Sequence, residues 1–124
     1  MKYNHEDCLA LLEEIRWRGI PQCPYCQSTN STAITKERRY HCNACFISYS
    51  VTVGTLFHKT RVDLQKWFLA IQIVLNSSGD ISGRQLAKEI GVNRNTAVYM
   101  IKRIRKAMTD EIELVQRLVE SDKL

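Results

Sequence analysis

The chain has 124 residues, of which 44% are hydrophobic and 25% are charged, and its formal net charge is +5. This composition is typical of a folded protein and argues against a disordered chain. It contains no run of about 18 apolar residues, so we expect no membrane span. The acidic N-terminal stretch lacks the apolar core of a secretory signal, and so short a chain offers little core for the deep pocket of an enzyme.

Positive charge is concentrated in one part of the chain. Residues 61–107 have a net charge of +6, whereas residues 1–60 have +2 and residues 108–124 have −3. A focused basic segment favours a polyanionic partner, most commonly nucleic acid, although a solvated helix face is the alternative.

The predicted elements begin with a helix from Asn4 to about Trp17, which Gly19 and Pro21 end. Residues 21–53 have no helical period. Short strands are expected over residues 31–35 and 38–42, and the alternation of apolar and polar residues over 47–53 predicts a third, half-buried strand.

From Thr60 the pattern becomes helical. Thr60 and Asp63 have the spacing of a capping box, and apolar residues follow at helical intervals to about Leu75. A second helix is expected from Ser82 to near Gly91, and a third begins after Asn93 and could continue to Ser121. Trp67, Phe68 and Ile104 are expected in the core, and Trp17 where the first helix meets the following segment.

Four of the five cysteines form two pairs, Cys23–Cys26 and Cys42–Cys45, separated by fifteen residues. This spacing is typical of a structural zinc site, because two tight turns joined by a hairpin can direct four sulfurs at one ion. A set of four protein ligands leaves no place for a reacting water, so we expect one structural Zn²⁺. Two disulfides, a redox pair and an iron centre are less favoured interpretations, and the spacing alone does not exclude iron.

Residues 82–100 have the pattern of a helix-turn-helix. Ala87 is small enough for close helix packing, and Gly91 permits a left-handed turn. The second helix would then lie in the major groove of DNA with its N-terminal residues at the base edges. A helical hairpin that contacts protein is the alternative.

Side-chain chemistry suggests roles for the residues of this motif. Arg94 can donate twice to guanine, Asn95 can pair with adenine, and Val98 can contact a thymine methyl group. Tyr99 is expected at the exposed surface, and Thr96 as a capping or phosphate-binding residue. The expected phosphate contacts are Arg84, Lys102, Arg103, Arg105 and Lys106.

Further short motifs keep a fixed order along residues 6–108: Cys8-Leu9, Arg16-Trp17, Cys23-Pro24-Tyr25-Cys26, Tyr40-His41-Cys42-Asn43-Ala44-Cys45, Val53-Gly54-Thr55-Leu56-Phe57, Trp67, Ser82-Gly83-Arg84-Gln85-Leu86-Ala87, Ile90-Gly91-Val92, Thr96-Ala97 and Arg103-Ile104-Arg105-Lys106-Ala107-Met108. In this order they resemble the N-terminal region of bacterial insertion-sequence transposases, which begin with a zinc ribbon and a helix-turn-helix and continue into an RNase H-like nuclease. The chain departs from that family at Val98, where Trp is common, so its base preference is expected to differ.

The resemblance implies DNA recognition, but we do not extend it to cleavage. Residues 109–124 hold the acids Asp110, Glu111, Glu113, Glu120 and Asp122 without a strand pattern, and these acids are expected on a solvated helix. The fold class is therefore expected to be a small, metal-stabilised α+β protein. Its segments are an N-terminal helix (1–20), a zinc ribbon (21–57), a helix-turn-helix domain with a long C-terminal helix (58–108) and an acidic helical tail (109–124).

The expected function is sequence-specific binding of double-stranded DNA, without enzyme activity, as a transcriptional regulator or an accessory protein of a mobile element. We expect a cytoplasmic, nucleoid-associated protein of a bacterium. The alternatives are an adaptor whose ribbon docks on a nuclease, polymerase or CRISPR-type complex, and a fragment of a transposase. Apolar residues of the tail, at helical spacing from Ile101 to Val119, either pair two chains as a homodimer or cover the chain's own core.

Overall fold

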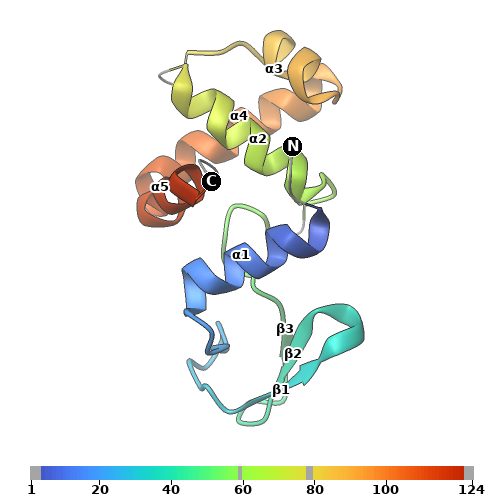
Figure 1. The fold of residues 1–124 in the computed structure, drawn as a ribbon, viewed down its shortest axis with the longest axis vertical. Helices are drawn as coiled ribbons and strands as arrows, with labels where there is room; N and C mark the ends of the chain where they lie inside the picture. The colour runs from blue at the N-terminus through green and yellow to red at the C-terminus, as the bar shows by residue number, and fades with distance from the viewer. Residues whose placement is uncertain (1–3, 59, 78–79, 122–124) are drawn as a thin grey trace. The chain divides into compact units, whose positions relative to one another are not determined.

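The computed structural model describes residues 4–58, 60–77 and 80–121. The chain divides into two compact units, a ribbon unit that ends at Thr60 and a helical unit that begins at Arg61. The ribbon unit contains α1 (His5–Trp17), β1 (Ser31–Ile34), a 3₁₀ turn (Thr35–Glu37), β2 (Arg39–Cys42) and β3 (Ser48–Tyr49). The helical unit contains α2 (Leu64–Asn76), α3 (Gly83–Ile90), α4 (Arg94–Asp110) and α5 (Ile112–Ser121) (Figure 1).

The first helix begins as the sequence predicts. The side chain of Asn4 accepts a hydrogen bond from the backbone N–H of Asp7, and the Asp7 carboxylate accepts one from the N–H of Asn4. This reciprocal capping box satisfies two N–H groups that a helix leaves without partners. The helix ends at Arg18, whose left-handed backbone (φ 51°) turns the chain towards the first cysteine pair.

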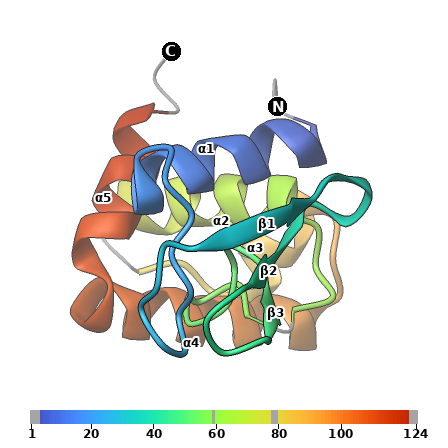
Figure 2. The same ribbon diagram turned by 90° about the horizontal axis from the view of Figure 1, so that it is seen from below.

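The three strands form one antiparallel sheet in the order β1-β2-β3, and Figure 2 shows them side by side. Trp17 packs against this sheet, as predicted, with its ring 5.4 Å from that of Tyr40 and 5.7 Å from that of Tyr49, both edge to face. The hydroxyl groups of Tyr49 and Ser31 are hydrogen-bonded at 2.6 Å. These aromatic contacts place α1 in the core of the ribbon unit.

The third strand is much shorter than the predicted span of residues 47–53. Since Tyr40 pairs with Tyr49, Val51 would have to pair with Arg38, but Arg38 has a left-handed backbone (φ 53°) that leaves the sheet. The carbonyl oxygens of Val51 and Val53 instead accept hydrogen bonds from Nη1 of Arg16, at 2.7 and 2.6 Å. The alternation of apolar and polar residues over 47–53 therefore predicted too long a third strand.

Charged groups also attach α1 to the hairpin. Arg38 donates from Nε to Glu13 at 3.1 Å and from Nη1 to Glu6 at 3.1 Å, and the Tyr40 hydroxyl donates to Glu13 at 3.0 Å. Hydrogen bonding to Glu13 raises the pKa of Arg38, and burial followed by the bond to Glu13 raises the pKa of Tyr40. Glu13 is thus the main polar link between α1 and the hairpin.

In the helical unit, the core predictions for Trp67, Phe68 and Ile104 are confirmed, since all three are buried. The predicted capping box at Thr60 is wrong: α2 begins at Leu64 with Asp63 as its N-cap, and the Asp63 side chain makes no capping hydrogen bond. Asp63 directly precedes the first buried residue of the apolar stripe, so the chain enters the helix there.

The last helical segment is not one continuous helix to Ser121. Helix α4 ends at Asp110 and α5 begins at Ile112, after the break at Glu111. Val115 and Leu118 of α5 are buried, and α5 packs against α2 and α4. These two side chains therefore belong to the chain's own core.

Candidate metal centre and nucleic-acid interface

The four paired cysteines converge on one point of the ribbon unit. Their Sγ atoms all lie within 4.8 Å of one another, with Cys23 and Cys45 at 3.7 Å and Cys26 and Cys42 at 3.5 Å. Zn–S bonds of 2.3 Å in a tetrahedron require sulfurs separated by about 3.8 Å. The cluster therefore fits one structural Zn²⁺ held by four thiolates, as predicted.

Two equivalent turns form this centre. The N–H of Gln27 donates to the carbonyl of Cys23, and the N–H of Phe46 donates to the carbonyl of Cys42, both at 2.9 Å. The residue after each second cysteine has a left-handed backbone, with φ of 69° at Gln27 and 64° at Phe46. Such a conformation costs a residue with a Cβ roughly 1–2 kcal/mol. Burial does not offset this cost at Phe46, because the residue is 74% exposed.

The backbone of the second turn prepares one ligand for the metal. The N–H of Cys45 donates to Sγ of Cys42 at 3.4 Å. This bond, with a further one from Ala44, outweighs burial and lowers the pKa of the Cys42 thiol to about 6. These donors favour the charged thiolate form of Cys42, which is the form that zinc binds.

His41 lies on β2 and is not part of this centre. Its ring is 6.3 Å from that of Phe46, and it pairs with Thr32 and Ser48 in the sheet. His41 is therefore an ordinary strand residue. Among the described residues, the group that could hold a metal consists of the four cysteines alone.

The helix-turn-helix has the geometry that its sequence predicts. Ser82 caps α3 by accepting from the N–H of Gln85 at 3.1 Å, and Asn93 caps α4 by accepting from the N–H of Thr96 at 2.7 Å. Between them, Gly91 ends α3 with φ 73°. Only glycine adopts this backbone without strain, so Gly91 permits the sharp turn that sets α4 against α3.

Helix α4 presents most of its predicted contact residues to solvent. Arg84 on α3 is also exposed, whereas Thr96, Val98 and Arg103 are half-buried. Val98 is less exposed than expected because it lies against Gly83 of α3. The exposed residues of α4 are Arg94, Asn95, Tyr99, Lys102, Arg105 and Lys106.

Tyr99 links the exposed side of α4 to the core. Its ring lies 6.2 Å from that of Trp67, edge to face, and the guanidinium of Arg103 lies 5.6 Å from its centre. A cation over an aromatic ring is attracted to it. Tyr99 therefore contacts both the buried Trp67 and Arg103, beside the residues expected to contact DNA.

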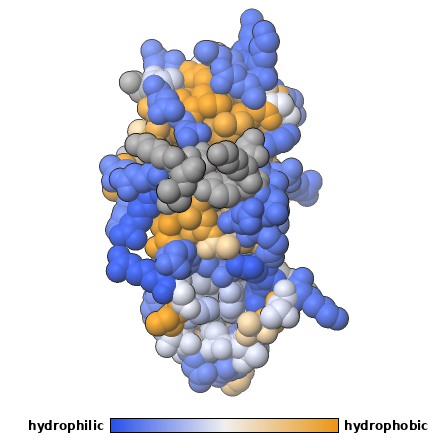
Figure 3. Space-filling view, viewed as in Figure 1, coloured by the Kyte–Doolittle hydropathy of each residue, from blue (hydrophilic) through white to orange (hydrophobic). Residues whose placement is uncertain are grey.

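One residue that supports the helix-turn-helix from outside could not be found from the motif. Lys66 of α2 donates from Nζ to the carbonyl of Gly91 at 3.1 Å and so ties α2 to the turn. It lies 25 positions before Gly91, and no local pattern relates the two residues. Figure 3 colours one face of the molecule by hydropathy. Over the helical unit, apolar residues lie in the middle of this face and hydrophilic residues lie along its edges.

Comparisons with known proteins agree with this geometry. Residues 3–46 match the transposase zinc-ribbon domain, and residues 66–118 match an HTH domain. The chain is 34% identical over 101 residues to an uncharacterized protein in the transposable element ISH50 of Halobacterium salinarum. The match covers 79% of the chain and 34% of that protein, so the chain spans about a third of the length of the curated relative it matches. No solved structure matches the chain.

The predicted resemblance to the zinc-ribbon and helix-turn-helix region of insertion-sequence transposases is thus confirmed. The two matched domains are a transposase zinc ribbon and an HTH domain, in the order that the sequence predicts. None of the helices within the described ranges is both long enough and apolar enough to cross a membrane.

Proposed function

We propose that this chain binds double-stranded DNA in a sequence-specific manner by placing α4 in the major groove. The observation that carries the proposal is the charge of α4: between Arg94 and Lys106 it has five basic residues and no acidic one, and four of the five are exposed. Counterion release from neutralised phosphates would supply most of the affinity. The N-terminal residues Arg94 and Asn95 would contact base edges.

In this proposal the zinc ribbon has a structural role, and the chain acts in the cytoplasm on the nucleoid as a regulator of transcription or an accessory protein of a mobile element. The relative in a transposable element supports the link to mobile DNA. Neither of the two matched domains supplies a nuclease centre, so we propose a binding role without catalysis for this part of the chain.

Selection of bound duplexes from a random pool by the zinc-loaded protein tests the proposal. Enrichment of one short motif, with binding that weakens by orders of magnitude between about 50 and 200 mM salt, is the expected result. Enrichment without a motif would limit the function to sequence-independent binding. A failure to retain any duplex at low salt would remove the proposal.

A second candidate function is protein docking through the ribbon. Tyr25, Phe46 and Ile47, in and beside the two zinc turns, are 54%, 74% and 45% exposed, although Phe and Ile are usually buried. An adaptor would retain a protein partner at salt concentrations that abolish DNA binding. Replacement of Phe46 by Ser would weaken that association and leave duplex binding unchanged.

A further inference from the structure

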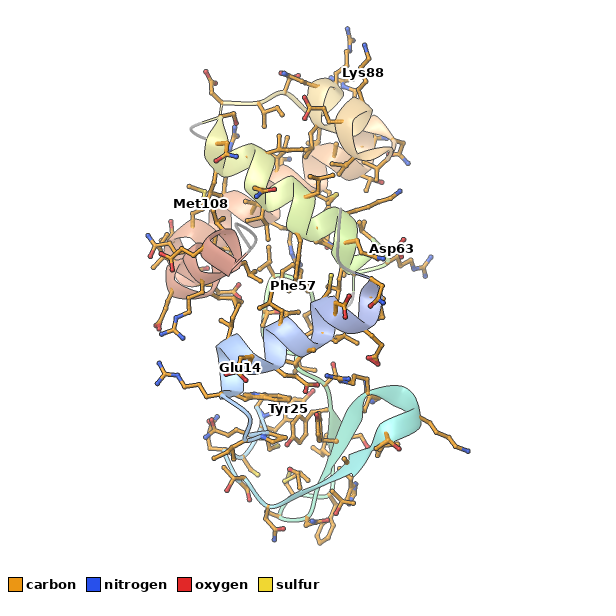
Figure 4. All side chains as sticks on the ribbon, viewed as in Figure 1. Glu14, Tyr25, Phe57, Asp63, Lys88 and Met108 are labelled. Carbon is orange, nitrogen blue, oxygen red and sulfur yellow. The ribbon has the colours of Figure 1, made fainter. Side chains whose placement is uncertain are left out.

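The helical unit contains a hollow of about 270 Å³ between the start of α2 and the turn before α4. Arg61, Asp63 and Lys66 line it from the α2 side, and Asn93 and Thr96 line it from the α4 side. Figure 4 marks Asp63 at the beginning of α2. Two regions about 30 residues apart in the sequence thus form one polar depression.

The charges of this hollow favour an anion. Its lining has two cationic side chains, Arg61 and Lys66, and one carboxylate, Asp63. Lys66 uses one donor on the carbonyl of Gly91, and an ammonium group has three donors, so two remain for a ligand. Arg61 is exposed, and the Thr96 hydroxyl adds a neutral hydrogen-bonding group.

We propose that this hollow binds a phosphate of the DNA backbone at the edge of the groove that α4 enters. The inference rests on the proposed function. Thr96 and Asn93 belong to the same helix start as Arg94 and Asn95, which would face the base edges. The major groove is only about 12 Å wide, so a duplex positioned on Arg94 brings a bordering strand next to this helix start. Arg61 and Lys66 then become phosphate contacts that fix the position of α4.

Asp63 provides a second test, in which a substitution should strengthen DNA binding instead of weakening it. Its carboxylate repels a phosphate in the hollow, and its side chain makes no capping hydrogen bond with α2. Asn is as good an N-cap residue as Asp, so Asp63→Asn removes the charge at little cost to the helix. A phosphate site requires Arg61→Ala to weaken DNA binding and Asp63→Asn to strengthen it.

The experiment measures the affinity of the zinc-loaded chain for its selected duplex over a range of salt concentrations. Arg61→Ala should lower the affinity about five- to tenfold at low salt and reduce the salt slope by about 1, without changing the preferred sequence. Lys88→Ala, an equal charge loss on α3 and outside the hollow, is the control (Figure 4). Thermal unfolding checks that each variant remains folded.

The outcomes separate this inference from the proposed function. If the wild type binds duplex but Arg61→Ala matches Lys88→Ala in both affinity and slope, the hollow is not a phosphate site and the groove-binding proposal stands. If inorganic phosphate alone shifts the amide resonance of Thr96 while Arg61→Ala leaves duplex binding unchanged, the hollow takes a free anion and the backbone assignment is overturned. If the wild type binds no duplex, both proposals fail.

Discussion

A Cβ atom added to Gly83 would clash with Cγ2 of Val98. Gly83 is the first residue of α3 and Val98 lies in the second turn of α4, so the two helices are in contact at this point. The contact is too close for any side chain at position 83 unless Val98 moves.

Gly83→Ala should therefore destabilise the helical unit. Overpacking of this kind costs about 1–3 kcal/mol, which equals or exceeds the gain of up to about 1 kcal/mol from a better helix former. Denaturant unfolding followed by the fluorescence of Trp67 measures the loss. In the double variant with Val98→Ala, the blocking methyl group is absent, so the cost of Gly83→Ala should disappear. Additive losses in the double variant would show that the contact is not the cause.

Removal of zinc should unfold the ribbon unit and leave the helical unit folded. Metal binding supplies about 10–16 kcal/mol of folding free energy in small zinc domains. The apolar core of so small a ribbon unit is not expected to provide enough stability without the ion. The two tryptophans report on the two units separately, because Trp17 packs on Tyr40 and Tyr49 of the ribbon unit whereas Trp67 is buried in the helical unit.

Two single-tryptophan variants test this prediction. With Trp67→Phe, a chelator should shift the emission of Trp17 to that of an exposed ring. With Trp17→Phe, the emission of Trp67 should not change. Cys26→Ser should reproduce the first shift without a chelator. Native Trp17 emission in metal-free protein would mean that the ribbon folds without the ion.

Glu13→Gln should destabilise the ribbon unit by about 1–2 kcal/mol, because a neutral amide replaces the carboxylate that accepts from Arg38 and Tyr40. Chemical denaturation of the zinc-loaded protein, followed at Trp17, gives the change. Glu14→Gln is the matched control, since it removes the same charge from the neighbouring, exposed position of α1 (Figure 4). Equal effects of the two substitutions would show that the bonds of Glu13 contribute nothing specific.

Local patterns predicted the parts of the fold that depend on spacing. The cysteine pairs specified the metal centre because a two-residue gap can direct two sulfurs at one ion. Ser82, Gly91 and Asn93 marked the ends of α3 and α4 because capping depends on residues within one turn.

Features that depend on distant partners were not predictable. The length of the third strand was set by Arg38 and by the bonds from Arg16 to Val51 and Val53, which join residues more than 30 positions apart. The break at Glu111 also lacked a signal: no Gly or Pro marks it, and the apolar period continues through it from Ile104 to Val115. The position of Arg61 beside Thr96 depends on the packing of α2 against α4 in the same way.

Arg94→Ala and Lys106→Ala should affect DNA binding in different ways. Arg94 lies at the N-terminus of α4, where a guanidinium can form two hydrogen bonds with guanine, so its loss should cost about 1–3 kcal/mol at one base pair and relax the preference there. Lys106 lies in the second half of the helix, where only phosphate is expected within reach, so its loss should weaken binding to all duplexes alike and lower the salt slope by about 1.

Titration of each variant against the selected site and its single-base variants measures both effects. Both residues are exposed, so neither change should alter thermal stability. If both substitutions weaken every duplex equally, α4 contacts only the backbone, and the assignment of Arg94 to a base edge is wrong.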